Sequence, residues 1–284
     1  MTAASTSLEP WVTPAATALR AQGFVVLEQF VPRIALVRMS SLVRSMLVDR
    51  LGPAMAPMMH GGDEGRDTPP GKDLVLWMKL RPQEQAIAAL SPLVRRARCI
   101  AAVALEAEPD AVEIGGRLFH KPARVGGRTP WHQDDAYDDP SSPRRRMTMW
   151  IPLVDVSPTS GCMLFVPNSH HGRLRPHQAG QGGRRLALST TLDPADTTCA
   201  VPMEAGDVSL HLGRTLHASG ANASPQPRPA LALVCTVPSQ AVGEQRPTAG
   251  GVEAGLRDTT DNLSLGSGRT PHAIAGSHNE DADR

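Results

Sequence analysis

The change of pattern near residue 111 constrains the fold more than any other feature of the chain. Beyond it, short apolar runs with β-favouring residues recur, and turns that contain proline or glycine separate them. The runs are Ala111–Ile114, Arg117–His120, Met147–Leu153, Cys162–Val166, Val208–Leu212 and Ala230–Val237. Short strands separated in this way are typical of a β-sandwich or barrel.

The first hundred residues have a different pattern, in which helical and extended segments alternate. The segment 14–22 predicts a short helix that ends at Gly23, because glycine readily adopts the left-handed conformation of a helix stop. The other predicted elements are helices over 32–48 and 91–106 and strands over 24–27 and 74–80. We therefore expect a mainly β fold in which flanking helices pack against a double-sheet core.

The 284 residues are predicted to form one domain over residues 1–240 and a disordered tail over residues 241–284. The tail is rich in Gly, Thr, Asp and Asn and has almost no aliphatic clusters, which helps to explain an apolar share of only 40% for the chain. The segment Met55–Lys72 is rich in glycine and proline, and it is a candidate lid over a binding site.

Net charge and cysteine usage narrow the class of protein. Lys plus Arg number 29 and Asp plus Glu number 28, so the formal net charge is +1 and a dedicated binder of nucleic acid or anionic membrane is disfavoured. No apolar run approaches the roughly 20 residues of a membrane span, and Met1–Pro14 lacks the features of a secretory signal. The four cysteines form no CxxC pair, so we expect reduced thiols in a cytoplasmic protein.

Two histidines and one carboxylate are candidate ligands of a single metal ion. His132 and Asp134 are separated by one residue, so on a strand their side chains would point to the same face. His217 follows a second predicted strand, which begins after Gly206-Asp207. These donors leave three positions open on an octahedral ion, as in non-haem iron oxygenases. The same donors also bind tetrahedral zinc in hydrolases, so these three residues do not decide between iron and zinc.

A candidate anchor for a dicarboxylate favours iron over zinc. Arg228 lies 11 residues after His217 and opens the predicted strand 230–237. Its guanidinium can hold the far carboxylate of 2-oxoglutarate through two parallel hydrogen bonds, a geometry that the point charge of lysine matches less well. Ser219 lies two residues beyond His217 and can donate its hydroxyl proton to the same carboxylate.

These motifs together resemble the phytanoyl-CoA dioxygenase family. The resemblance covers about residues 15–240. It rests on Trp131-His-Gln-Asp134, on the run from Met149-Trp150-Ile-Pro-Leu through Gly161 and Pro167 to Asn168-Ser169-His170, and on Gly206-Asp207, His217-x-Ser219-x-x-Asn222 and Arg228. It implies a double-stranded β-helix (jelly-roll) core and an oxidation that depends on Fe(II) and 2-oxoglutarate. O₂ would be the cosubstrate, ascorbate a stimulant, and succinate and CO₂ the coproducts.

The resemblance also implies roles for individual residues. The iron ligands, and hence the catalytic centre, would be His132, Asp134 and His217. The residues that bind the cosubstrate would be Arg228, Ser219, Trp150, Lys79 and Gln133. The match at Lys79 is looser because its neighbours diverge from the family. Asn168 stands where the family often has glycine, but asparagine also tolerates a left-handed turn.

The reaction expected from this resemblance is the oxidation of a small molecule. Halogenating relatives have a small residue in place of Asp134, so hydroxylation is favoured here, while desaturation, cyclisation and epimerisation stay open. Arginine makes up 26 of the 29 basic residues, and alanine and proline are abundant, which suggests a GC-rich bacterial genome and a natural-product substrate. The alternatives are a fatty acyl-CoA substrate, for which no basic patch stands out, a catalytically silent jelly-roll binding protein, and a zinc hydrolase.

Other histidines and arginines near these motifs are assigned structural or solvent-exposed roles. His211 is expected to be a packed core or wall residue. His170, His171 and His177 are expected at surface or loop positions, and Arg144–Arg146 at a solvated loop edge. A structural or pocket-wall role is expected for His120-Lys121-Pro122. Arg117 is a weak pocket candidate.

The acidic residues after the metal motif have two interpretations. Asp135, Asp138 and Asp139 are expected to form a hydrated acidic loop. The functional alternative is that they attract a cationic or polar natural product, such as one that carries an amine, to the mouth of the site.

Overall fold

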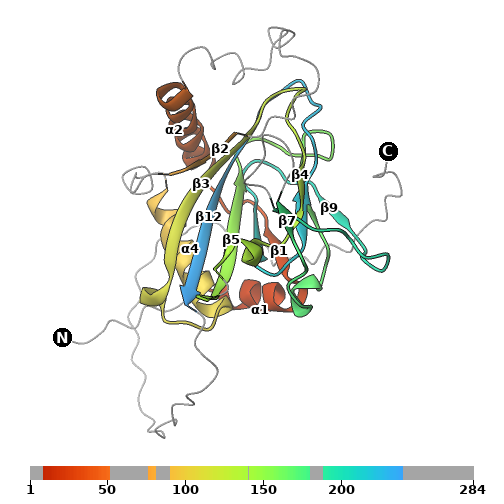
Figure 1. Ribbon diagram of the computed structural model, residues 1–284. Coiled ribbons are helices and arrows are strands. Elements are labelled where there is room, and N and C mark those ends of the chain that lie inside the picture. The colour runs from red at the N-terminus through yellow and green to blue at the C-terminus, as the bar shows by residue number, and fades with distance from the viewer. Residues whose placement is uncertain (1–8, 52–75, 81–89, 140, 180–187, 239–284) are drawn as a thin grey trace, which may run out of the picture.

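Two antiparallel sheets make up the core of the computed structural model, which describes residues 9–51, 76–80, 90–139, 141–179 and 188–238 (Figure 1). The larger sheet has the strand order β1-β10-β5-β12-β3-β2, and the smaller has the order β4-β11-β6-β9. A separate ribbon pairs β7 with β8. The predicted mainly β fold with flanking helices and a jelly-roll core is confirmed.

The elements have the following bounds. The strands are β1 Phe24–Leu27, β2 Leu76–Lys79, β3 Glu113–Lys121, β4 Thr129–His132, β5 Arg144–Pro152, β6 Met163–Phe165, β7 Gln178–Ala179, β8 Leu188–Ser189, β9 Cys199–Val201, β10 Val208–Leu212, β11 His217–Ser219 and β12 Arg228–Pro238. The helices are α1 Val12–Gln22, α2 Arg33–Leu51 and α4 Ser91–Ala104, with the short 3₁₀ helices η3 Pro109–Ala111, η4 Asp134–Tyr137 and η5 Ser169–His171.

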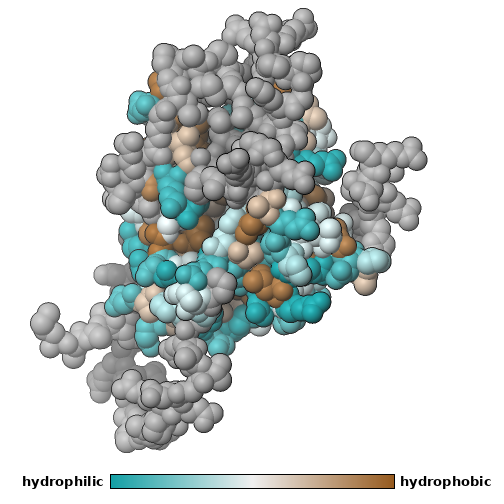
Figure 2. All heavy atoms as spheres, viewed as in Figure 1, coloured by the Kyte–Doolittle hydropathy of each residue, from teal (hydrophilic) through white to brown (hydrophobic). Residues whose placement is uncertain are grey.

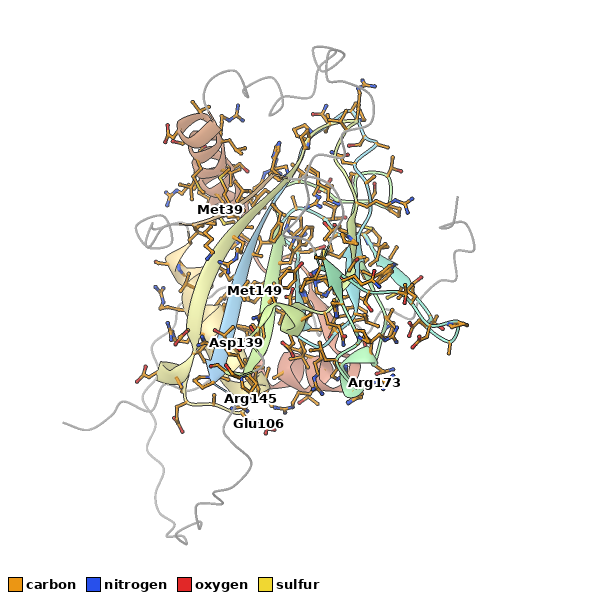
Figure 3. The ribbon with its side chains drawn as sticks, in the orientation of Figure 1. Met39, Glu106, Asp139, Arg145, Met149 and Arg173 are labelled. Atoms are coloured by element: carbon orange, nitrogen blue, oxygen red, sulfur yellow. The ribbon has the colours of Figure 1, made fainter. Side chains whose placement is uncertain are left out.

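Alternate residues of the six-stranded sheet face two different cores, because side chains along a strand point to opposite sides. On β5, Met147 and Met149 pack with α1 and α4 on the outer face of the sheet (Figures 1 and 3). Trp150 packs on the inner face with Phe165 from the smaller sheet. The site described below is built on this inner face. On the surface seen in Figure 2, apolar residues form small patches among hydrophilic ones.

The predicted helices and strands are present with shifted ends. The first helix begins at Val12 and ends at Gly23, whose φ of 86° is the predicted left-handed stop. The left-handed turn predicted at Asn168 is also present, with φ 63°. The runs 111–114 and 117–120 were expected to be two strands, but Gly115 and Gly116 lie inside the single strand β3. Regular pairing with β12 holds these glycines in the sheet despite their low strand propensity.

Some predictions fall outside the described residues. The candidate lid Met55–Lys72 and the tail 241–284 both lie there, so the single domain over 1–240 stays a prediction. No helix among the described residues is long and apolar enough to cross a bilayer. Strands β4, β7, β8, β9 and β11 were not predicted. Each has two to four residues, which is too short for a periodic pattern to be recognised.

Candidate active site

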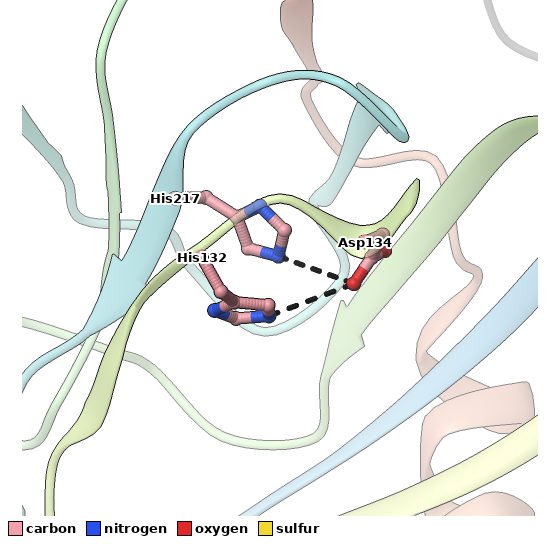
Figure 4. A group of neighbouring side chains, drawn as sticks. All are labelled: His132, Asp134 and His217. Atoms are coloured by element: carbon pink, nitrogen blue, oxygen red, sulfur yellow. Dashed lines mark ion pairs between the residues drawn. The ribbon is translucent and has the colours of Figure 1, made fainter. Parts of the chain in front are cut away.

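His132, Asp134 and His217 converge at one point between the two sheets (Figure 4). Asp134 Oδ1 lies 3.5 Å from His132 Nε2 and 3.7 Å from His217 Nε2. One donor atom from each of the three residues lies within 4.8 Å of the others, close enough to share one ion. The structure therefore brings the three predicted ligands together.

Strand pairing positions the two histidines, while a turn positions the carboxylate. His132 is the last residue of β4 and lies directly opposite His217 of β11. Gln133 continues in extended conformation, and Asp134 then begins the 3₁₀ helix η4. The prediction that Asp134 shares a strand face with His132 is therefore wrong in its reason, because β4 ends first. The turn of η4 brings the carboxylate to the imidazoles instead.

Backbone carbonyls set the tautomer of both candidate ligands. His132 Nδ1 lies 2.8 Å from Pro130 O, and His217 Nδ1 lies 2.9 Å from Thr215 O. A carbonyl only accepts, so each Nδ1 carries the proton and donates it. In the neutral form of each imidazole the lone pair is therefore on Nε2, the atom nearer Asp134, and this is the form that binds a metal.

The second oxygen of Asp134 is held by the inner face of the large sheet. Thr148 Oγ1 donates a hydrogen bond of 2.9 Å to Asp134 Oδ2, and His211 Nε2 lies 3.6 Å from the same oxygen. Burial raises the pKa of Asp134, but the neighbouring His217, His132 and His211 outweigh it, and the net pKa lies well below its usual value. Asp134 is therefore ionised, with Oδ1 directed toward the histidines.

His217 has the protonation state that complements this carboxylate. Burial first, and then the neighbouring imidazoles of His132 and His211, lower the pKa of His217 well below its usual value. A neutral imidazole and an ionised carboxylate are the forms that bind a divalent metal. The residues present therefore fit such an ion.

His211 forms part of the wall of this site, in agreement with its predicted packed position. It is 2% exposed, and its ring centroid lies 4.4 Å from that of His217. Phe165 is also a neighbour of His211, and their ring centroids lie 5.5 Å apart. The sequence spacing did not reveal that His211 would also approach the metal-binding carboxylate.

Gln133 holds the segment between the ligands in place. Its Nε2 donates to Arg214 O at 2.7 Å, and its Oε1 accepts from the backbone N–H of Arg175 at 2.8 Å. The backbone N–H of Gln133 donates to His177 Nε2 at 3.0 Å. Both ends of the buried amide thus bind backbone groups, which gives Gln133 a positioning role, and its predicted contact with the cosubstrate stays a prediction.

Two of the three histidines predicted at surface or loop positions are part of the structure around the site. His177 accepts the backbone hydrogen bond from Gln133, as described above. His170 Nε2 lies 2.8 Å from Arg20 O and fastens η5 to the end of α1. Burial lowers the pKa of both His170 and His177. His171 is exposed, in agreement with the prediction.

The expected solvated loop edge at Arg144–Arg146 is wrong. These arginines are the first residues of β5, and each is half-buried. Arg145 donates to Leu105 O and lies beside Glu106 at the same end of the sheet (Figure 3). Arg146 donates to Asp134 O and to Asp138 Oδ1. Distant acceptors, which a local charge pattern cannot reveal, bring these side chains into the sheet.

The three acidic residues after the ligands are not equally hydrated. Burial raises the pKa of Asp135 to about 7. Asp138 pairs with Arg146, and its side chain is 12% exposed. Asp139 is exposed, and its oxygen accepts from Ser141. The hydrated acidic loop is therefore confined to Asp139, since the other two carboxyl groups are largely removed from water.

Arg228 is a buried cation on the inner face of β12. It is 2% exposed, and its Nε and Nη1 atoms are buried without a hydrogen-bond partner among the described residues. Burial lowers its pKa to about 10. The guanidinium carbon lies 5.3 Å from the ring centroid of Trp150, which supports it from one side. Buried donors of this kind fit a carboxylate ligand, since leaving such groups unpaired is costly.

Lys121 connects Arg228 with Ser219, whereas Lys79 is at the edge of the sheet. Lys121 of β3 is the cross-strand neighbour of Arg228, and its Nζ donates to Ser219 Oγ at 2.8 Å. Lys79 lies in β2 opposite Arg117, with an exposed side chain. In the sequence, Lys121 stands two residues after Phe119. On one strand the two side chains share a face, which here is the inner face of β3.

Comparison with known proteins agrees with this arrangement. The profile of the "Phytanoyl-CoA dioxygenase (PhyH)" family matches residues 19–230. The chain is 28% identical over 121 residues to the mouse "Phytanoyl-CoA dioxygenase, peroxisomal", an alignment that covers 40% of this chain and 36% of the mouse protein. It is 33% identical over 105 residues to a "Probable alpha-ketoglutarate-dependent hypophosphite dioxygenase" of Stutzerimonas stutzeri, over 35% of this chain and 36% of that protein. These alignments thus span little more than a third of the relatives.

A solved structure is similar over a larger part of the chain. EvdO2 from Micromonospora carbonacea var. aurantiaca, crystallised with 2-oxoglutarate, is 27% identical with a TM-score of 0.66. The match covers 81% of this chain and 93% of EvdO2. The fold, the three converging ligands and a profile match that extends over most of the chain lead to one conclusion: this protein belongs to the phytanoyl-CoA dioxygenase family.

Proposed function

We propose that the protein is an Fe(II)- and 2-oxoglutarate-dependent dioxygenase that oxidises, and in the simplest case hydroxylates, a small molecule. The observation that carries the proposal is the pairing of two features on one inner surface. One is the triad His132, Asp134 and His217, and the other is the buried guanidinium of Arg228, whose Nε and Nη1 have no hydrogen-bond partner among the described residues. A zinc hydrolase or a silent binding protein has no chemical use for both.

The chain's contribution to such a reaction is to hold and orient the reactants. His132 and His217 would present Nε2 to iron, and Asp134 would present one oxygen while Thr148 keeps the other occupied. Iron and 2-oxoglutarate, when bound, supply the oxidising power from O₂ and release succinate and CO₂. A single bound carboxylate oxygen leaves coordination positions for the cosubstrate and O₂.

Arg228 would bind the far carboxylate of 2-oxoglutarate. A buried guanidinium makes strong charge-assisted hydrogen bonds to a carboxylate because water does not compete there. Trp150 would keep the guanidinium in place and exclude water from its face. Ser219, which is also buried, would add a donor from the smaller sheet.

For the substrate we propose a polar small molecule of bacterial natural-product metabolism. The arginine-rich composition supports a bacterial origin, and one relative is named as a probable hypophosphite dioxygenase, whose named substrate is not an acyl-CoA. Since Asp138 is paired with Arg146, attraction of a cationic substrate would rely on the exposed Asp139. A fatty acyl-CoA substrate is the second candidate, favoured by the family profile.

An anaerobic titration of the metal-free protein tests the proposal. Fe(II) and then 2-oxoglutarate are added, and the weak visible charge-transfer band of the chelate is recorded. We expect a band for the wild type and for Arg173→Ala, an exposed arginine remote from the triad in sequence, and none for His132→Ala. Arg228→Ala should require much more 2-oxoglutarate. Absence of a band in folded, iron-loaded wild type would contradict the proposal, and tight stoichiometric zinc with no response to 2-oxoglutarate would favour the hydrolase.

A further inference from the structure

Lys121 is a buried cation that joins the two sheets beside the proposed cosubstrate pocket. It is 0% exposed and lies in β3, directly opposite Arg228 of β12. Its ammonium donates to Ser219 Oγ at 2.8 Å, to Ser219 O at 3.3 Å and to Gly220 O. Ser219 belongs to β11 of the smaller sheet, so these bonds tie the two sheets together where the pocket is expected.

The contact with Lys121 determines which way the Ser219 hydroxyl can donate. An ammonium has only donors, so Ser219 Oγ must be the acceptor in this bond. The hydroxyl proton of Ser219 therefore has to point toward a different acceptor. Among the described residues the structure shows none for it, and Ser219 is only 5% exposed. A buried donor without an acceptor is energetically costly, so we expect a bound molecule to supply the acceptor.

Arg228 of β12 also has buried donors without acceptors among the described residues. Its Nε and Nη1 lack partners in the described part of the chain. Lys121 lies next to both groups, through strand pairing with Arg228 and through its hydrogen bond to Ser219. Two positive charges side by side in a buried place repel each other, and an anion that binds there relieves the repulsion.

We propose that Lys121 is a positioning residue of the 2-oxoglutarate pocket, which directs the Ser219 hydroxyl and adds a second buried positive charge beside Arg228 for the far carboxylate. The inference rests on the proposed function. Its consequence is selectivity: Lys121 should strengthen binding of a 2-oxo acid with a second carboxylate and should matter little for one without it.

Calorimetric titration of the Fe(II)-loaded full-length protein without O₂ tests this selectivity. The two ligands are 2-oxoglutarate and 2-oxopentanoate, which has a methyl group in place of the far carboxylate. Lys121→Met removes the charge, and Lys121→Gln removes it but keeps an amide donor for the carbonyls of Ser219 and Gly220 if the methionine variant does not fold. Arg173→Met is the control, since it removes a positive charge from an exposed site.

We expect either Lys121 variant to weaken 2-oxoglutarate binding by about tenfold or more, the scale of a charge-assisted hydrogen bond, and to leave 2-oxopentanoate binding unchanged. The loss should shrink in a Ser219→Ala background, because the two residues act together. Equal losses for both ligands would show a general structural role and overturn the inference, as would unchanged binding of both. If the wild type binds neither ligand, the proposed function itself fails.

Discussion

Thr148 donates its hydroxyl proton to Asp134 Oδ2 over 2.9 Å, from the inner face of β5 to the first residue of η4. This bond occupies one oxygen of the carboxylate and leaves the other between the two imidazoles. A group that hydrogen-bonds to a metal-binding side chain sets the orientation and the basicity of that side chain. The bond also links the candidate metal centre to the central strands of the larger sheet.

Thr148→Val should weaken metal binding while the fold stays intact. Valine has the shape of threonine but cannot donate, so Asp134 loses its orientation, and the expected loss of Fe(II) affinity is about 10- to 100-fold. Anaerobic calorimetry with Fe(II) measures the change. Thr197→Val is the control, because Thr197 is exposed and lies just before β9, at the edge of the smaller sheet opposite to the β4 edge. Equal affinities for both variants would argue against a role for the hydroxyl.

Gln133→Leu should destabilise the fold and disturb the metal centre together. Leucine leaves the N–H of Arg175 and the carbonyl of Arg214 without partners, which should cost about 2 kcal/mol or more of unfolding free energy. Urea unfolding in the presence of a chelator measures this loss without a metal contribution. Gln178→Leu, at an exposed position of β7, should change the free energy little. A Gln133 variant as stable as the wild type would contradict the positioning role.

The contribution of His170 to the stability of the metal-free protein should fall as pH decreases from 7.5 to 5. Burial lowers the pKa of His170 below its ordinary value of 6.5, so the unfolded chain binds the proton more readily than the folded one. The stabilisation is therefore complete above pH 6.5 and is lost as pH falls through the lower, folded-state pKa. His170→Gln keeps a donor for Arg20 O but cannot titrate. Melting temperatures across this range should decline less for the variant, and an equal decline would count against the assignment.

Metal removal should lower the thermal stability reversibly. An ion that binds only the folded state stabilises it by about 2.7 kcal/mol when its concentration is 100 times the dissociation constant. Treatment with a chelator should lower the melting temperature, and anaerobic Fe(II) should restore it. His217→Ala should melt at the same temperature with and without Fe(II), because one of three ligands is missing. A full Fe(II) response in this variant would mean that the ion binds elsewhere.

Residue type and spacing indicated a metal site with two imidazoles and a carboxylate, and the resemblance to the phytanoyl-CoA dioxygenase family implied which chemistry it would perform. His132, Asp134 and His217 were candidate ligands on this ground, and Arg228 was a candidate anchor for a dicarboxylate. The structure brings the first three together and buries the fourth, whose Nε and Nη1 have no partner within the described part of the chain. The longer strands were also predictable, since five or more apolar residues between turns form a recognisable pattern.

The positioning residues could not be predicted, because their partners are distant in the chain. Lys121 contacts Ser219 across 98 positions, and Gln133 contacts Arg214 across 81. Arg146 looked like part of a solvated charge run until strand pairing placed it beside Asp134. Sequence alone determined which groups are available and roughly where strands begin. Only the tertiary structure decided which buried donor meets which acceptor, because that depends on how two sheets pack against each other and not on local spacing.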